Sequence, residues 1–199
     1  MRLTIFRHAS YDTPWWAFPS PSDGRFHRAS LDTVQYLCLH PFGPAAEMLR
    51  HHIGPTGDPD DLLLNLWTAT VNIEPTRVDF DDCATYGLTP DELVGDDYAP
   101  TQALAAAVRR NGADAMIVPS AALPGTHNLI LFDVRLLIPF LGLPVAPEDI
   151  PTGHLTDGAR PAAEVAAHVR WRGTPHSAAD QWNATGRYDL FDDPPATRW

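Results

Sequence analysis

Three residues that can do chemistry are evenly spaced near the start of the chain. Arg25, Tyr36 and Glu47 each lie eleven residues from the next. Eleven residues would make three turns of a continuous helix, but Pro41 and Pro44 interrupt this stretch and forbid one. The three side chains must therefore come from different elements. The question is what a guanidinium, an aromatic ring and a carboxylate would do together.

Two arginines are candidates to hold an anionic group. Arg25 follows Gly24 at the end of a loop, where it is either a solvated surface residue or a clamp whose planar fork suits phosphate. Gly24 would let the backbone come close to such a ligand. Arg7 shares a strand face with Leu3 and Ile5 by period-two alternation, so its charge needs an anionic partner. That partner is either a ligand or an internal carboxylate, and both readings stay open.

Three further candidates each have a structural explanation beside the functional one. Tyr36 alternates with Val34 and Cys38, so it is either a core tyrosine or a ring that lines a pocket. Glu47 lies beside the apolar stripe of its helix, where a solvated glutamate is the ordinary interpretation. Ser120 follows a proline at the end of an apolar run, a place where serine usually forms a turn or caps a helix.

Composition limits the classes of partner. The chain has 199 residues, enough for one domain or one domain with an appendage, and 44% of them are hydrophobic. A net charge of -11 repels nucleic acid, although a few local arginines still allow a small anionic ligand. Cys38 and Cys83 are too few for a disulfide framework or a thiolate zinc site, and the histidines form no known metal motif.

Localisation follows from what the ends and apolar runs contain. Only four residues separate Arg2 from Arg7, too short a run for the apolar core of a signal peptide. The longest apolar run, at 136–147, carries three prolines and is too short to span a bilayer. We therefore expect a cytoplasmic protein.

The order of expected elements predicts an α+β fold. Proline at position 44, a capping box of Thr89 with Glu92, and the pair Asn111-Gly112 mark helix ends. Strands are expected at 3–6, 34–40, 61–73, 76–80, 115–120 and 127–133, and helices at 43–52, 89–95, 99–112 and 160–173. Residues 9–24 are expected to form a long loop, and 174–199 a docked or partly disordered tail. Strands, then helices, then strands fit α+β better than an alternating α/β order.

The ordered series of these features resembles a known family. The segment "GRFHRASLDTVQYLCLHPFGPAAEMLRHH" at 24–52 resembles the core signature of RES-domain proteins, named for an arginine, a glutamate and a serine. The resemblance continues through Tyr98, Thr101-Gln102 and Pro119-Ser120, and it covers about residues 3 to 135.

The resemblance assigns roles to five residues. It maps the family's arginine to Arg25, its glutamate to Glu47 and its serine to Ser120. The arginine of the first strand maps to Arg7 and the intervening tyrosine to Tyr36. The roles that follow are catalysis for Glu47, Arg25 and Tyr36, and substrate binding for Arg7, Ser120, Arg25 and Tyr36.

The sequence departs from the family pattern in two places. Asp23 stands before Gly24 where the family often has a second glycine, and the resemblance does not extend past residue 150. We therefore expect a RES-like catalytic domain at 1–150 and a C-terminal helix and tail at 151–199 that pack on the same domain.

The resemblance also implies a fold and a function. RES proteins are similar to ADP-ribosyltransferases, with mixed sheets and flanking helices around an NAD+ cleft, and the family includes toxins paired with antitoxins of the Xre helix-turn-helix type. The implied activity is cleavage of the nicotinamide–ribose bond of NAD+ by phosphorolysis or hydrolysis, with no cofactor, NAD+ as substrate and inorganic phosphate as a candidate co-substrate. Two alternatives remain, namely a protein mono-ADP-ribosyltransferase and a catalytically silent interaction domain of the same fold.

Overall fold

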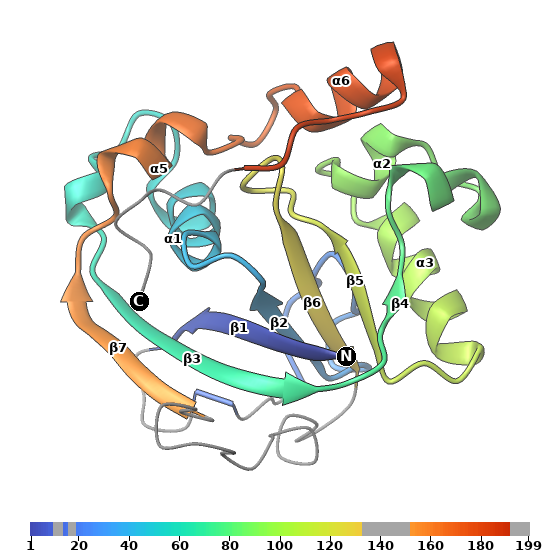
Figure 1. Ribbon diagram of the computed structural model, residues 1–199, viewed down its shortest axis with the longest axis horizontal. Helices are drawn as coiled ribbons and strands as arrows, with labels where there is room; N and C mark the ends of the chain where they lie inside the picture. The colour runs from blue at the N-terminus through green and yellow to red at the C-terminus, as the bar shows by residue number, and fades with distance from the viewer. Residues whose placement is uncertain (10–13, 16–18, 133–151, 192–199) are drawn as a thin grey trace.

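One mixed sheet forms the frame of the molecule (Figure 1). The computed structural model describes residues 1–9, 14–15, 19–132 and 152–191. In this part of the chain seven strands pair in the order β4–β5–β6–β2–β1–β3–β7. Their bounds are β1 Arg2–His8, β2 Val34–Cys38, β3 Leu64–Asn72, β4 Thr76–Arg77, β5 Ala115–Pro119, β6 His127–Phe132 and β7 Thr152–Ala159.

The helices are short and lie around this sheet. They are α1 Gly43–Met48, α2 Pro90–Val94, α3 Ala99–Arg110, α5 Ala163–His168 and α6 Ser177–Thr185, with a π-helix η1 Leu49–Ile53 and two 3-10 helices, η2 Pro59–Asp61 and η3 Phe80–Tyr86. None of the helices in the described residues has the length and apolar character needed to cross a bilayer.

The sheet and its helices confirm the predicted α+β class. β4 pairs with β5 in parallel, whereas the other neighbouring strands pair antiparallel. In Figure 1, α2 and α3 lie beside the β4–β5 end of the sheet, and α1 lies next to the middle strands. Helices α5 and α6 lie along the side of the molecule where α1 and α2 are found.

Side chains of β5 and β6 alternate between two hydrophobic clusters, one on each face of the sheet. On one face Met116 and Ile130 pack with apolar residues of α3, including Leu104. On the other face Ile117 and Leu129 pack with strand residues from β1, β2 and β3. Because successive side chains point to opposite faces, the near-continuous apolar run of each strand is what burial on both sides requires.

Several sequence predictions need correction. The strand expected at 76–80 ends at Arg77, because the Asp79 side chain accepts a hydrogen bond from Phe80 N and starts the 3-10 helix η3 there. The helix expected at 160–173 is only α5, Ala163–His168. The helix expected at 43–52 does form, as α1 followed by η1.

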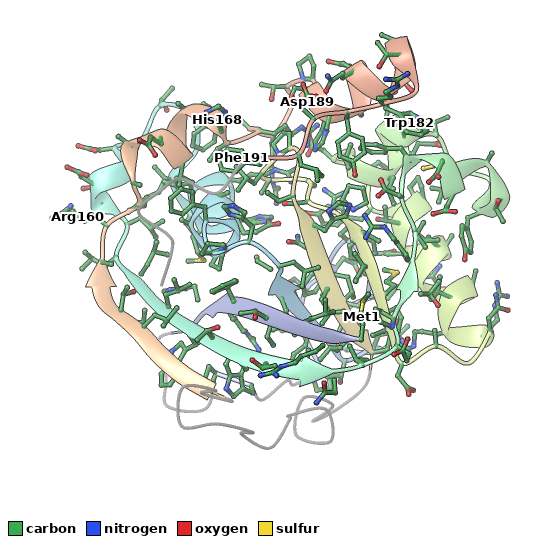
Figure 2. The ribbon with its side chains drawn as sticks, in the orientation of Figure 1. Met1, Arg160, His168, Trp182, Asp189 and Phe191 are labelled. Carbon is green, nitrogen blue, oxygen red and sulfur yellow. The ribbon has the colours of Figure 1, made fainter. Side chains whose placement is uncertain are left out.

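The C-terminal segment contributes more than a tail. β7 pairs antiparallel with β3 and was not predicted, and α6 forms in the expected tail and packs against α2. Trp182 of α6 lies 6.1 Å from the ring of Phe80, and Phe191 lies 5.2 Å from the ring of His168. Figure 2 shows His168, Trp182 and Phe191 along one side of the molecule. The predicted domain boundary at residue 150 falls outside the described residues, so the division into 1–150 and 151–199 stays a prediction.

Candidate active site

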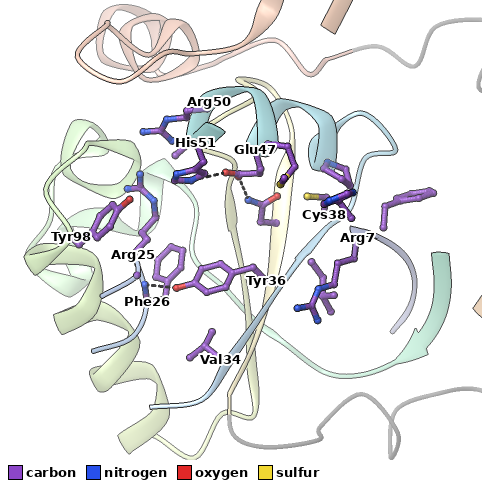
Figure 3. A pocket seen from close by; sticks show the side chains of 18 of the residues that line it. Arg7, Arg25, Phe26, Val34, Tyr36, Cys38, Glu47, Arg50, His51 and Tyr98 are labelled. Atoms are coloured by element: carbon purple, nitrogen blue, oxygen red, sulfur yellow. Dashed lines mark hydrogen bonds and ion pairs between the residues drawn. The ribbon is translucent and has the colours of Figure 1, made fainter. Parts of the chain in front are cut away.

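A cavity of about 590 Å³ opens on the face of the sheet that carries α3, between α3 and α1 (Figure 3). Strands β1 and β2 form its floor, and the loop 22–26 forms one wall. The residues with polar side chains that line it include Arg7, His8, Ser22, Asp23, Arg25, Tyr36, Glu47, Arg50, His51, Tyr98, Asn128 and Arg172. Four of the five predicted site residues, Arg7, Arg25, Tyr36 and Glu47, are thus brought together from separate elements.

Hydrogen bonds to backbone carbonyls of its loop hold Arg25 in place, and they do not involve its guanidinium. Its carbonyl oxygen accepts a hydrogen bond of 2.6 Å from Thr101 Oγ1, and Gln102 Nε2 donates to the carbonyls of Gly24 and His27, both at 3.0 Å. The first turn of α3 therefore fixes the loop. The guanidinium lies 5.3 Å from the ring centroid of Tyr98, a cation–π distance.

The Arg25 guanidinium has spare hydrogen-bonding capacity. Its Nη1 is buried and has no hydrogen-bond partner among the described residues. Burial, together with the nearby charge of Arg50, lowers the pKa of Arg25 to about 10, which still leaves it charged at neutral pH. A buried cation with an unused donor is the arrangement expected where an anionic ligand binds.

The hydroxyl of Tyr36 belongs to a hydrogen-bond chain with a fixed direction. His27 Nε2 lies 3.0 Å from the carbonyl oxygen of Ser22, which can only accept, so Nε2 carries the proton. In the neutral imidazole, His27 Nδ1 then accepts from the Tyr36 hydroxyl at 2.8 Å, and the hydroxyl oxygen accepts from Phe26 N at 3.0 Å. The single proton of Tyr36 is committed to His27, and burial raises the pKa of Tyr36 well above its ordinary value. The ring, rather than an acidic hydroxyl, is what Tyr36 presents to the cavity.

Gly24 allows this chain to close. A Cβ at position 24 would lie 2.2 Å from His27 Cε1 and 2.8 Å from the Tyr36 hydroxyl. Both distances are far below van der Waals contact, so any larger residue would displace the chain. The close approach that the sequence suggested for Gly24 is therefore to the protein's own side chains.

Glu47 is neither solvated on a surface nor neutralised by an arginine. Its carboxylate accepts a hydrogen bond of 2.9 Å from Asn128 Nδ2, and its Oε2 lies 3.6 Å from His51 Nε2; dashed lines in Figure 3 mark both. Burial alone would raise the pKa of Glu47, but His51, the Asn128 amide and the charge of Arg50 outweigh it and hold that pKa below its ordinary value. Glu47 is therefore ionised at neutral pH with 27% of its side chain exposed.

The lining carries more positive than negative charge. Four arginines, Arg7, Arg25, Arg50 and Arg172, face the cavity with two carboxylates, Asp23 and Glu47. Figure 3 places Arg25 and Arg50 to one side of Tyr36 and Arg7 to the other. In a protein of net charge -11 this local excess of positive charge runs against the overall sign and favours an anionic ligand in the cavity.

Ser120 lies outside the lining. It is completely buried, and its Oγ accepts hydrogen bonds from Ala122 N at 3.3 Å and Leu123 N at 3.1 Å in the turn between β5 and β6. The turn-forming interpretation describes these contacts, whereas the substrate-binding role that the resemblance gave Ser120 stays a prediction. The neighbours of Ser120, Pro119 and Ala121, do line the cavity.

Sequence reasoning missed several residues of the site. Arg50 and His51 follow Glu47 on the same helical stretch, and their proximity to it was a usable signal. Asn128 is the second residue of β6, and the residues that follow it in the strand are apolar, so its polarity was a weak signal. Arg172 comes from the C-terminal segment, and nothing in its sequence context points to the cavity.

The family is decided by a match that spans most of the chain. Residues 2–140 match the RES domain. The chain belongs to the RES domain family. Its relatives include a probable NAD(+) phosphorylase of Mycobacterium tuberculosis (strain ATCC 25618 / H37Rv), which is 34% identical over 117 residues. That match covers 58% of this chain and 56% of the relative, so this RES domain aligns with only a little over half of that protein.

The fold of this RES domain is also that of a solved structure. The crystal structure of the M. tuberculosis MbcT-MbcA toxin-antitoxin complex contains a chain that superposes with a TM-score of 0.57. The superposition covers 78% of this chain and 85% of the other, at 17% sequence identity. At that identity the likeness establishes a shared fold.

Proposed function

We propose that this RES domain consumes NAD+ by breaking the bond between nicotinamide and ribose. The observation that carries the proposal is the cavity in which Arg25, with an unused buried donor, meets the Tyr36 ring and an ionised Glu47. Its volume of about 590 Å³ falls within the range of roughly 300–1,000 Å³ that is usual for small-molecule sites. The name of the mycobacterial relative supports the same substrate.

The residues present fit what this bond cleavage needs. As the bond lengthens, positive charge develops on C1 and O4 of the ribose, while the leaving nicotinamide takes the bonding electrons and becomes neutral. No acid has to protonate it. The site must instead supply negative charge facing C1 and a fixed geometry, and Glu47, oriented by Asn128, provides both.

Binding is assigned to the other members of the site. Arg25 is the group we assign to the diphosphate, because its planar fork can make two parallel hydrogen bonds to phosphate oxygens. The Tyr36 ring packs the nicotinamide. Arg7 lines the far side of the cavity and adds positive charge there.

The name of the relative favours phosphate as the acceptor. In phosphorolysis an oxygen of inorganic phosphate bonds to C1 as the C1–nitrogen bond breaks, giving ADP-ribose 1″-phosphate and nicotinamide. In hydrolysis water takes that place and the products are ADP-ribose, nicotinamide and a proton. The name of the relative gives no such support to a protein side chain as acceptor, so transfer to protein is the weaker candidate.

The test is incubation of the purified protein with NAD+ in the presence and absence of phosphate, with products identified by mass spectrometry. We expect nicotinamide release in both cases or only with phosphate, and ADP-ribose 1″-phosphate when phosphate is the acceptor. NAD+ left intact under both conditions by folded protein would overturn the proposal.

We also propose that the protein is the toxin of a toxin–antitoxin pair. The shared fold with a chain of the MbcT-MbcA complex supports this, as does an activity that would deplete a central metabolite. The antitoxin expected is a helix-turn-helix protein of the Xre type that closes the cavity. Expression of the wild type should lower cellular NAD+ and arrest growth, whereas Glu47→Gln should do neither. Normal growth despite falling NAD+ would count against the toxin role.

A further inference from the structure

The C-terminal segment reaches the cavity from beyond the RES domain match, which ends at residue 140. Its contribution is Arg172, which lies at the rim and is exposed. Arg172 Nη2 lies 3.2 Å from the Tyr98 hydroxyl and 2.9 Å from His51 Nδ1. A segment outside the family match thus places a cation among the residues of the proposed NAD+ site.

Specific hydrogen bonds hold the turn that presents Arg172. Asp96 accepts a hydrogen bond from Arg170 Nη1 at 2.6 Å and another from Gly173 N at 2.7 Å, which fixes the residues on both sides of Arg172. Arg170 also donates from Nε to the Thr174 carbonyl at 2.9 Å, and its backbone N donates to the Ala122 carbonyl at the same distance. Gly173 has a φ of +78°, which a residue with a side chain rarely adopts.

The charge of Arg172 is not neutralised by this arrangement. Neither of its hydrogen-bond partners, Tyr98 and His51, is a carboxylate. Asp96, the carboxylate that holds the turn, is already shared by Arg50 and Arg170. Within the described residues Arg172 makes no ion pair, so its guanidinium keeps a full charge and unused donors at the rim.

Arg172 and Arg25 flank the same ring. Arg25 stacks 5.3 Å from the centroid of Tyr98, and Arg172 contacts the hydroxyl of that ring. Both arginines thus contact Tyr98, one at the ring face and one at the hydroxyl, and two like charges around one ring favour a bound anion. The planar fork of each arginine can make two parallel hydrogen bonds to phosphate oxygens.

We propose that Arg172 and Arg25, on either side of Tyr98, form a phosphate-binding subsite supplied in part by the C-terminal segment. This rests on the proposed function for its ligand, which is a phosphate group of the dinucleotide or the free phosphate acceptor. The subsite makes the turn 170–173 a determinant of how tightly this protein binds its substrate. It also sets this protein apart from any family member that lacks such a segment.

The experiment compares the wild type with Arg172→Ala and with Arg187→Ala, which removes an equal charge from an exposed arginine of the same segment outside the cavity lining. Calorimetric titration with ADP-ribose tests the diphosphate, and the KM for inorganic phosphate during NAD+ turnover tests the acceptor. We expect Arg172→Ala to weaken one of the two by about tenfold or more, as for hydrogen bonds to a charged group, and Arg187→Ala to leave both within twofold.

The two measurements identify which phosphate Arg172 binds, and they test the subsite separately from NAD+ turnover. A loss confined to ADP-ribose binding assigns Arg172 to the dinucleotide, and a loss confined to the phosphate KM assigns it to the acceptor. If the wild type leaves NAD+ intact, the proposed function fails, and titration with inorganic pyrophosphate then tests the subsite alone. Equal binding constants in wild type and Arg172→Ala, or no binding of either probe by the wild type, would overturn the subsite.

Discussion

Two polar clusters in this molecule use nearly the same residue types with opposite outcomes. The cavity combines arginines, Tyr36, His51 and Glu47. Beneath the C-terminal segment, Asp79 accepts from Arg77 at 3.0 Å, from His127 at 3.1 Å and from the Tyr188 hydroxyl at 3.0 Å. Residue type and burial alone do not tell the two clusters apart.

The difference lies in what each cluster leaves unused. Asp79 accepts many hydrogen bonds, since its side chain also caps the 3-10 helix η3 through Phe80 N, and none of the cluster's residues lines the cavity at Arg25 and Glu47. In the cavity, Arg25 Nη1, Arg50 Nε and Asn128 Oδ1 are buried without hydrogen-bond partners among the described residues. A saturated network stabilises a fold, whereas a network with spare donors facing a cavity is ready for a ligand. The following variants test that contrast.

The largest effect is expected from Glu47→Gln. The amide keeps the shape of the side chain but loses the negative charge that faces the developing ribose cation, so turnover of NAD+ should fall by roughly a hundredfold or more. Binding of intact NAD+ should change much less, because the ground state carries less charge at C1. Steady-state kinetics and calorimetry measure the two quantities. Glu164→Gln, an exposed glutamate of α5, is the matched control, and near-normal turnover in Glu47→Gln would remove Glu47 from the reaction.

The next largest effect is expected from Arg25→Lys. Lysine keeps the charge but cannot make two parallel hydrogen bonds to phosphate, so NAD+ binding or transition-state stabilisation should weaken by about 1.5–3 kcal/mol. Arg28→Lys changes an exposed arginine three residues away and should have no effect. Kinetics for both variants, with circular dichroism to confirm folding, decide the matter. Unchanged kinetics in Arg25→Lys would make Arg25 a structural residue.

Asp79→Asn should act on stability instead of activity. Burial alone would raise the pKa of Asp79, but hydrogen bonds from His127, Phe80 N and Arg77 hold it well below 3.8. We expect the free energy of unfolding to drop by about 2 kcal/mol, with NAD+ turnover of the folded protein unchanged.

The pH dependence of that loss has a definite sign. Because the folded-state pKa is depressed, the unfolded chain binds more protons in acid, so the contribution of Asp79 is complete at neutral pH and declines from about pH 5 downward. Denaturation curves at several pH values should therefore show wild type and Asp79→Asn converging in acid. Asp81→Asn, an exposed neighbour, should follow the wild type throughout. A constant gap between wild type and Asp79→Asn at all pH values would contradict this account.

The smallest effect is expected from Tyr36→Phe. Its hydroxyl proton is committed to His27, so losing it should cost about 1 kcal/mol of stability and leave turnover within a few-fold of the wild type. Tyr36→Ala also removes the ring and should reduce activity much further. Thermal unfolding and kinetics of both variants separate hydroxyl from ring. A Tyr36→Phe protein as inactive as Tyr36→Ala would mean that the hydroxyl itself takes part in the reaction.

Local sequence signals predicted many of the helix and strand boundaries. The capping box of Thr89 with Glu92 starts α2 as expected, and α3 ends at Arg110, just before the predicted stop at Asn111-Gly112. At Asp79 two local signals compete. The alternating pattern predicts a strand through residue 80, but the Asp79 side chain accepts a hydrogen bond from Phe80 N and starts a 3-10 helix instead. Strand β7 lacks an apolar alternation, and its pairing with β3 is a tertiary contact that no local pattern encodes.

The cavity was predictable only in part for the same reason. The ordered series of the family placed Arg7, Arg25, Tyr36 and Glu47 around one cleft. Arg172 lies beside His51 although 121 residues separate them in the sequence. That contact depends on the hydrogen bonds from the turn 170–173 to Asp96 and on the packing of the C-terminal segment. Ser120 was predicted to bind substrate, but its buried hydroxyl accepts a hydrogen bond within its own turn.

The most direct test of the contrast between the two clusters is a crystal structure of Glu47→Gln with NAD+. The variant should bind the dinucleotide without consuming it. The account predicts the diphosphate at Arg25, the nicotinamide against the Tyr36 ring, and ribose C1 facing position 47, with the Asp79 cluster unchanged. A dinucleotide bound elsewhere on the molecule, or an empty cavity in crystals saturated with NAD+, would contradict it.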